Sequence, residues 1–237
     1  MRSVVVQYLG LIDYMECWAL QKKLFDKLIT VKTADFVPEY EADAVGQTLL
    51  LCEHPHVYTL GKSGKENNLL INSEFMTGIG AEYHRVDRGG DITYHGPGQL
   101  VGYPILDLED LGIGLKDYVH GLEQTIIDTI GRFGIRGERS EGATGVWLAA
   151  DGKRPLRKIA AIGVRSSHFV TMHGFSLNVK PDMKYFSYIN PCGFTDRGVT
   201  SMEQELAEGV EMEEVKRLFI AEFEKVFGIT TTIKSDR

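Results

Sequence analysis

A glycine-rich segment, residues 88–100, gathers side chains that could bind a polar ligand. It reads Arg-Gly-Gly-Asp-Ile-Thr-Tyr-His-Gly-Pro-Gly-Gln-Leu, with Arg88 at its start and His95 near its middle. Glycines let the backbone approach a ligand closely and present N–H groups in conformations that other residues avoid. Since the spacing is not that of a phosphate-binding loop or a dinucleotide fingerprint, the segment is either a binding loop of another kind or a glycine-rich surface turn.

A second segment, residues 157–163, places Lys158 at the mouth of an apolar strand. Its sequence is Arg-Lys-Ile-Ala-Ala-Ile-Gly, and the small residues Ala160, Ala161 and Gly163 leave room beside a sheet for an apolar chain. Most lysines in such a position point into solvent. Lys158 is therefore either an ordinary surface lysine or a cation at the entrance of an apolar binding site.

A third region contains His173 and, further on, Cys192 between Pro191 and Gly193. A cysteine in such a turn can expose its thiol and lie near N–H groups that would stabilise an oxyanion. Its reactivity depends on a thiolate, which a nearby lysine or histidine would favour, and many turn cysteines are inert. His95 and His173 are equally compatible with a structural, hydrogen-bonded role and with catalysis.

The other two of the three cysteines, Cys17 and Cys52, fit the role of small buried hydrophobes. An odd number of cysteines at wide spacings argues against a disulfide framework. His54 and His56 flank a proline, but the sequence indicates no third ligand beside them, so no metal site is predicted.

Composition and charge exclude several classes of protein. The 237 residues carry 26 basic and 33 acidic side chains, a net charge of −7, which argues against a general nucleic-acid binder. No apolar run reaches the roughly 18 residues of a membrane span, and the first residues do not form a secretory signal. We therefore expect a soluble, cytoplasmic protein.

The charge is unevenly distributed along the chain. Residues 152–180 contain six lysines and arginines and no acidic residue, whereas residues 203–224 contain eight glutamates. The basic segment is either a solvated surface or a docking face for an acidic partner.

The apolar pattern predicts the elements that must position these residues. We expect strands at residues 4–9, 46–52, 57–60, 145–149, 159–164 and 174–179. Apolar residues three and four apart predict helices at 115–133 and 212–226, and Asp13 is the expected N-cap of a further helix. Asp151-Gly152 predicts a hairpin turn. With no linker or repeat, residues 1–237 are expected to form a single α+β domain, a mixed and largely antiparallel sheet flanked by helices.

Taken together, the three segments resemble the octanoyltransferases of lipoate biosynthesis, the lipoyl(octanoyl) transferase family. The matching stretches are residues 88–99, residues 158–163 with His173-Gly174, and residues 190–193. His54-Pro55 and residues 58–61 also resemble the family, so the likeness covers most of the chain, although no motif follows Met202.

The resemblance implies the α+β fold of lipoate and biotin protein ligase catalytic domains. It implies transfer of an octanoyl group from octanoyl-acyl carrier protein to the lysine ε-amine of lipoyl domains in 2-oxoacid dehydrogenases and the glycine cleavage system. Cys192 matches the family nucleophile, which forms an acyl thioester, and Lys158 matches the residue that lowers its pKa. The positions matching the substrate-binding stretches are Arg88, Gly89, Gly90, Asp91, Ile92, Thr93, Tyr94, His95, Ala161, Ile162, Gly163, His173, Gly174, Phe175 and Ser176.

This chemistry is coherent without a cofactor. A thioester is already activated, so its aminolysis is expected to need no ATP, metal or redox group. A cationic Lys158 would stabilise the Cys192 thiolate, whereas a neutral Lys158 could accept a proton from the incoming amine if burial lowered its pKa from about 10.4. Acyl carrier proteins are acidic, as the resemblance implies, so residues 152–180 become the expected docking surface.

Three other functions compete with this one. They are an ATP-dependent lipoate-type ligase, which would not need Cys192, a Cys/His thioesterase or amidase, and a non-catalytic module that binds acyl carrier protein. The sequence leaves open the acyl chain length, the preferred lipoyl domain and the oligomeric state, with a monomer as the working expectation.

Overall fold

A mixed sheet forms the centre of the computed structural model, which describes residues 2–34, 46–190, 197–206 and 209–234. Within these residues it has nine strands, ordered β12-β1-β2-β6-β10-β9-β8-β7, with β11 beside β9. The bounds are β1 (Ser3–Leu11), β2 (Gln47–Glu53), β6 (Gln99–Ile105), β7 (Glu138–Ser140), β8 (Ala143–Leu148), β9 (Arg157–Ser167), β10 (Val170–Asn178), β11 (Gly198–Val199) and β12 (Thr230–Ile233). In the run β2-β6-β10-β9-β8-β7 successive strands are antiparallel, whereas β11 is parallel to β9 and β1 is parallel to both β2 and β12. The expected α+β fold with a mixed, largely antiparallel sheet is confirmed.

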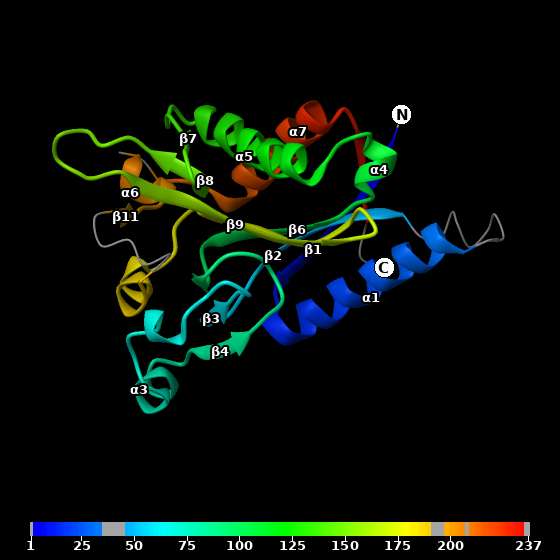
Figure 1. Cartoon of the computed structure of the whole chain (residues 1–237). Coiled ribbons are helices and arrows are strands. Elements are labelled where there is room, and N and C mark those ends of the chain that lie inside the picture. The colour runs from blue at the N-terminus through cyan, green and yellow to red at the C-terminus, as the bar shows by residue number, and fades with distance from the viewer. Residues whose placement is uncertain (1, 35–45, 191–196, 207–208, 235–237) are drawn as a thin grey trace.

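Helices cover both faces of this sheet. Helix α1 (Tyr14–Thr33) lies on one face, and α5 (Leu115–Gly131) and α7 (Met212–Phe227) pack together on the other (Figure 1). Asp13 caps α1 as expected, because its carboxylate accepts a hydrogen bond of 2.9 Å from the Glu16 N–H. The shorter helices are η1 (Glu66–Asn68), α3 (Ser73–Gly78), α4 (Leu108–Leu111), η2 (Met183–Tyr188) and α6 (Met202–Glu205). No helix among the described residues combines the length and apolar character that a membrane crossing requires.

The apolar stripe of each helix supplies one half of the core. On the α5 and α7 face, the ring centroids of Phe175 and Phe219 are 4.6 Å apart. On the α1 face, Phe25 and Leu28 pack in a cluster with Val101 and Met172. Burial of each such side chain contributes about 1.5–3 kcal/mol, so the helices are held to the sheet by packing.

A second, three-stranded sheet lies on the same side as α1 (Figure 1). It contains β3 (Val57–Leu60), β4 (Glu82–Arg85) and β5 (Ile92–His95), with β3 in the middle. The expected strand at residues 57–60 is confirmed, but the glycine-rich segment is not only a loop: it supplies β5 and the start of β6. Gly98 makes the sharp connection between them, since its φ of +87° is open to glycine and strained for other residues.

The hairpin between β8 and β9 is also confirmed, but its connection is longer than a two-residue turn. Asp151 stabilises it by accepting hydrogen bonds from the N–H groups of Lys153 and Arg154. Gly152 adopts a φ of +79° within it.

Candidate active site

A cavity of about 260 Å³ opens between the two sheets. Strands β9 and β10 form one wall, where Ala161 pairs with Ser176 and Gly163 with Gly174. Strand β5 and the loop before it form another. Most of the positions that the sequence assigned to substrate binding line this one cavity: Arg88, Gly90, Asp91, Ile92, Thr93, His95, Ala161, Ile162, Gly163, His173, Gly174, Phe175 and Ser176. The fold thus brings the first and second segments and His173 together, while their role in binding substrate stays a prediction.

Two of the predicted residues do not line the cavity. The Gly89 N–H donates a 2.9 Å hydrogen bond to the Val164 carbonyl and so ties the loop to β9. Tyr94 alternates with its neighbours along β5 and points the other way, where its ring stacks on Tyr185 at 5.1 Å. Both residues support the cavity from outside. Cys192, the predicted nucleophile, lies outside the described residues.

Glycine is required in the cavity wall because two pieces of backbone approach closely. A Cβ atom at Gly163 would lie 2.8 Å from the Gly89 carbonyl oxygen, and one at Gly174 would lie 2.1 Å from the Gly102 carbonyl oxygen. The small residues expected to leave room for an apolar chain therefore also allow the sheet and the loop to meet.

Lys158 is half-buried and lines the cavity. Its ammonium donates a hydrogen bond of 3.2 Å to the Thr144 carbonyl and sits 4.6 Å from the centroid of the Trp147 ring. The face of an indole ring stabilises a cation. These contacts favour the charged form, the form that would stabilise a neighbouring thiolate.

His173 is held in an unusual conformation by Asp87. Its backbone has a φ of +60°, rare for a residue with a side chain, and its N–H donates to Oε1 of Gln21 at 3.2 Å. Its Nε2–H donates to Asp87 Oδ1 at 2.7 Å, and Arg165 pairs with the second oxygen of this carboxylate. Backbone strain of this kind persists where surrounding contacts fix it.

The electrostatics keep His173 neutral and Asp87 charged. Burial lowers the pKa of His173, although the Asp87 hydrogen bond partly opposes this, and the same bond is the main reason that the pKa of Asp87 is lowered. Because Nε2 carries the proton, Nδ1 bears a lone pair, and within the described part of the chain this buried atom has no hydrogen-bond partner. Nδ1 is therefore the basic atom of the neutral His173 ring. Sequence reasoning missed Asp87, although it directly precedes the glycine-rich segment.

His95 is also buried and neutral, but its surroundings are a continuous network. Burial holds its pKa well below the usual value. Nδ1 lies 3.3 Å from Gln99 Oε1, the Gln99 amide donates to Asn178 Oδ1 at 2.8 Å, and Asn178 donates to the Thr200 carbonyl at 2.9 Å. This chain of partners fits a residue that shapes the site.

Arg88 brings a buried positive charge to the cavity. Its guanidinium donates to the Thr59 carbonyl at 2.6 Å and to the Gly89 carbonyl at 2.9 Å. The charge also helps to keep both cavity histidines neutral. Apolar walls beside cationic groups suit an acyl chain that ends in a polar carbonyl.

Several lining residues were not predicted from the sequence. They come from α1, β6, the start of β8 and the C-terminal third of the chain: Tyr14, Tyr103, Gly142, Ala143, Thr144, Asn178, Phe186 and Val199. Apart from Asn178, which ends the segment that begins at His173, none belongs to a motif, so only the fold places them at the cavity.

Acids from outside the basic segment, residues 152–180, pair with its arginines. Arg157 and Arg154 both pair with Glu205, at 2.7 and 2.9 Å. Both also contact Asp151. The arginines of this segment are thus engaged in ion pairs, and Lys153 and Lys180 are exposed lysines.

Sequence comparison assigns the chain to a class of catalytic domain. The profile of the lipoyl protein ligase A/B catalytic domain matches residues 13–224, so the chain belongs to that family. A bipartite lipoate protein ligase from Thermoplasma acidophilum shares the fold, with a TM-score of 0.71 at 13% identity over 100% of this chain and 88% of the other.

Within that family the chain belongs with the octanoyltransferases. It is 55% identical over 206 residues to the octanoyltransferase of Bacteroides fragilis, covering 87% of this chain and 90% of that protein. It is 49% identical over 229 residues to the octanoyltransferase of Cytophaga hutchinsonii, covering 96% and 94%. The resemblance drawn from the three segments is confirmed.

Proposed function

We propose that the protein transfers an octanoyl group from octanoyl-acyl carrier protein to the lysine ε-amine of a lipoyl domain through a thioester on Cys192. The observation that carries this proposal is the shared cavity, where Lys158, apolar walls and the glycine-rich segment meet. The octanoyltransferase relatives supply the reaction class.

The reaction would proceed in two acyl transfers. The Cys192 thiolate attacks the octanoyl carbonyl, the carrier's C–S bond breaks, and the carrier sulfur leaves and takes up a proton. The lipoyl-domain amine then attacks the enzyme thioester, releases Cys192 as thiolate and loses a proton. Lys158 near Trp147 supports the thiolate in both steps, and His173 Nδ1 is the described group best suited to accept the amine proton.

We further propose that an acidic carrier protein docks near Lys153 and Lys180. These lysines are exposed, whereas the arginines of the same segment are engaged in ion pairs. Electrostatic steering of this kind raises the association rate and weakens as salt is added.

Intact-mass measurement after mixing with octanoyl-acyl carrier protein tests the mechanism. We expect one octanoyl adduct on the wild-type protein and on the Cys17→Ala control, and none on Cys192→Ala. Addition of a lipoyl domain should discharge the adduct without ATP. Octanoyl transfer that continues while Cys192 stays unmodified would contradict the covalent route. Hydrolysis of the octanoyl thioester at a rate that the lipoyl domain does not change would indicate a thioesterase.

A further inference from the structure

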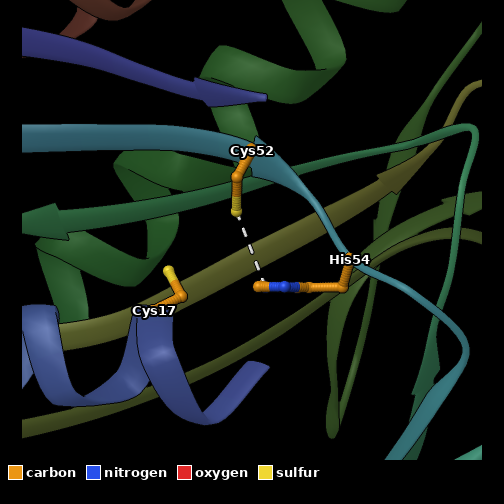
Figure 2. A group of neighbouring side chains, drawn as sticks. All are labelled: Cys17, Cys52 and His54. Carbon is orange, nitrogen blue, oxygen red and sulfur yellow. Dashed lines mark hydrogen bonds between the residues drawn. The ribbon is translucent and has the colours of Figure 1, made fainter. Parts of the chain in front are cut away.

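Two buried thiols and an imidazole converge outside the cavity. Cys17 projects from α1, Cys52 from β2, and His54 from the segment directly after β2 (Figure 2). Their sulfur and nitrogen atoms all lie within 4.8 Å of one another. The exposed fractions of the two cysteines are 0% and 1%, and that of His54 is 0%. The reaction proposed above uses none of these groups.

The spacing fits donors around one cation. The distance from Cys52 Sγ to His54 Nε2 is 3.5 Å. Zinc bonds of about 2.3 Å to sulfur and about 2.0–2.1 Å to nitrogen, at tetrahedral angles, place these two donors about 3.6 Å apart. Cys52 and His54 would therefore need little movement relative to each other to bind one ion.

The hydrogen bonds around the group direct its lone pairs inward. The Nδ1–H of His54 donates to the Ile12 carbonyl at 2.7 Å, so the ring lone pair lies on Nε2, where it now accepts from the Tyr103 hydroxyl. A backbone contact at the other ring nitrogen is the usual support of a metal-binding histidine. The Gln21 side chain accepts from the His173 N–H through Oε1, which leaves its NH₂ to donate to Cys17 Sγ at 3.8 Å.

We propose that Cys17, Cys52 and His54 bind a single thiophilic cation of the Zn²⁺ or Cu⁺ class. Thiolate and imidazole donors select these ions over Mg²⁺ and Ca²⁺, which prefer oxygen. The site joins α1 to β2 and so cross-links helix and sheet. The Tyr103 hydroxyl, now 2.7 Å from His54 Nε2, would give up this contact, and Tyr103 also lines the cavity.

Metal titration in a Cys192→Ala background tests the proposal without interference from the predicted nucleophile, and independently of acyl transfer. Zn²⁺ and Cu⁺ are added separately in competition with a chromogenic chelator, and Co²⁺ serves as a spectroscopic probe of thiolate ligands. We expect one equivalent of Zn²⁺ or Cu⁺, with sulfur-to-cobalt charge-transfer absorption and a higher Tm in the bound protein.

Matched variants decide whether these residues are the ligands. Cys17→Ser preserves the size of the side chain, and Cys52→Ala removes the second sulfur should the first variant misfold. Each is expected to weaken binding at least about 100-fold and to abolish the charge-transfer band, while Ser167→Ala has no effect. Stoichiometric binding that survives both cysteine variants, no binding of either ion, or formation of a Cys17–Cys52 disulfide in place of binding would overturn the proposal.

Discussion

At the scale of single residues, the pairing of Asp87 with His173 decides which nitrogen of the ring carries the proton. The carboxylate accepts the proton of Nε2 at 2.7 Å, so Nδ1 remains the basic atom. Burial alone would make this imidazole a weak base, and the carboxylate restores part of its basicity because it stabilises the protonated ring. Asp87 is thus a positioning residue that also tunes its partner.

Replacement of Asp87 tests this assignment. In Asp87→Asn the pKa of His173 should fall further, since the charge that raises it is gone, and NMR titration of the imidazole measures this directly. The free energy of unfolding should fall by about 1–3 kcal/mol, because the amide loses the charge that binds the buried His173 and the half-buried Arg165. Asp26→Asn, which removes an exposed carboxylate from α1, should change stability by less than about 0.5 kcal/mol. An unchanged His173 pKa in Asp87→Asn would show that the carboxylate does not act on the ring.

At the scale of secondary-structure elements, the contact between β10 and β6 requires glycine. Gly102 leaves space for the Phe175 ring, and Gly174 leaves space for the Gly102 carbonyl. The pair β10 and β6 therefore packs against the α5 and α7 helices through Phe175, and it forms part of the cavity wall through Gly174.

A methyl group added to β10 should break this arrangement. Gly174→Ala places a Cβ 2.1 Å from backbone oxygen, and neither strand can move without disturbing the core, so we expect a loss above about 2 kcal/mol in unfolding free energy. The control is Gly131→Ala in α5, where a Cβ would meet nothing within 4 Å. It should be stabilising by up to about 1 kcal/mol, because alanine favours helix. Urea unfolding measures both, and equal effects would contradict the role given to Gly174.

The elements with strong local signals were predictable from the sequence, and those that depend on distant partners were not. The Asp13 cap and the apolar spacing of α5 and α7 are local, and these helices form as expected. Strand β5 was missed because glycines surround it and its partner β3 is remote in sequence. The motifs that indicated the cavity are likewise local signals. The approach of Cys17 to Cys52 depends instead on how α1 packs, so it could not be predicted.

At the scale of the whole molecule, neutral histidines are buried where the two sheets and α1 meet. His95 lies on β5, His173 on β10 and His54 after β2. Burial lowers the pKa of all three. In the unfolded chain these histidines are exposed and their pKa values are near 6.5. At a pH between 6.5 and their lower pKa values in the folded protein, the unfolded chain therefore binds more protons than the native protein does. Stability must therefore fall as the pH drops below about 6.5.

The slope of stability against pH measures this effect. We expect the urea midpoint to decrease from pH 7 to pH 5, and His95→Gln should flatten the decrease, because His95 has the most strongly lowered pKa and glutamine keeps a hydrogen-bonding group toward Gln99. His120→Gln, on the exposed side of α5, should keep the wild-type slope even if it shifts the midpoint. Asp87 does not confound the measurement, since its pKa is lowered and the stability it provides is lost only below about pH 3.9, as the pH falls through its folded value. An unchanged slope in His95→Gln would mean that protonation of this buried imidazole does not limit the stability of the fold in acid.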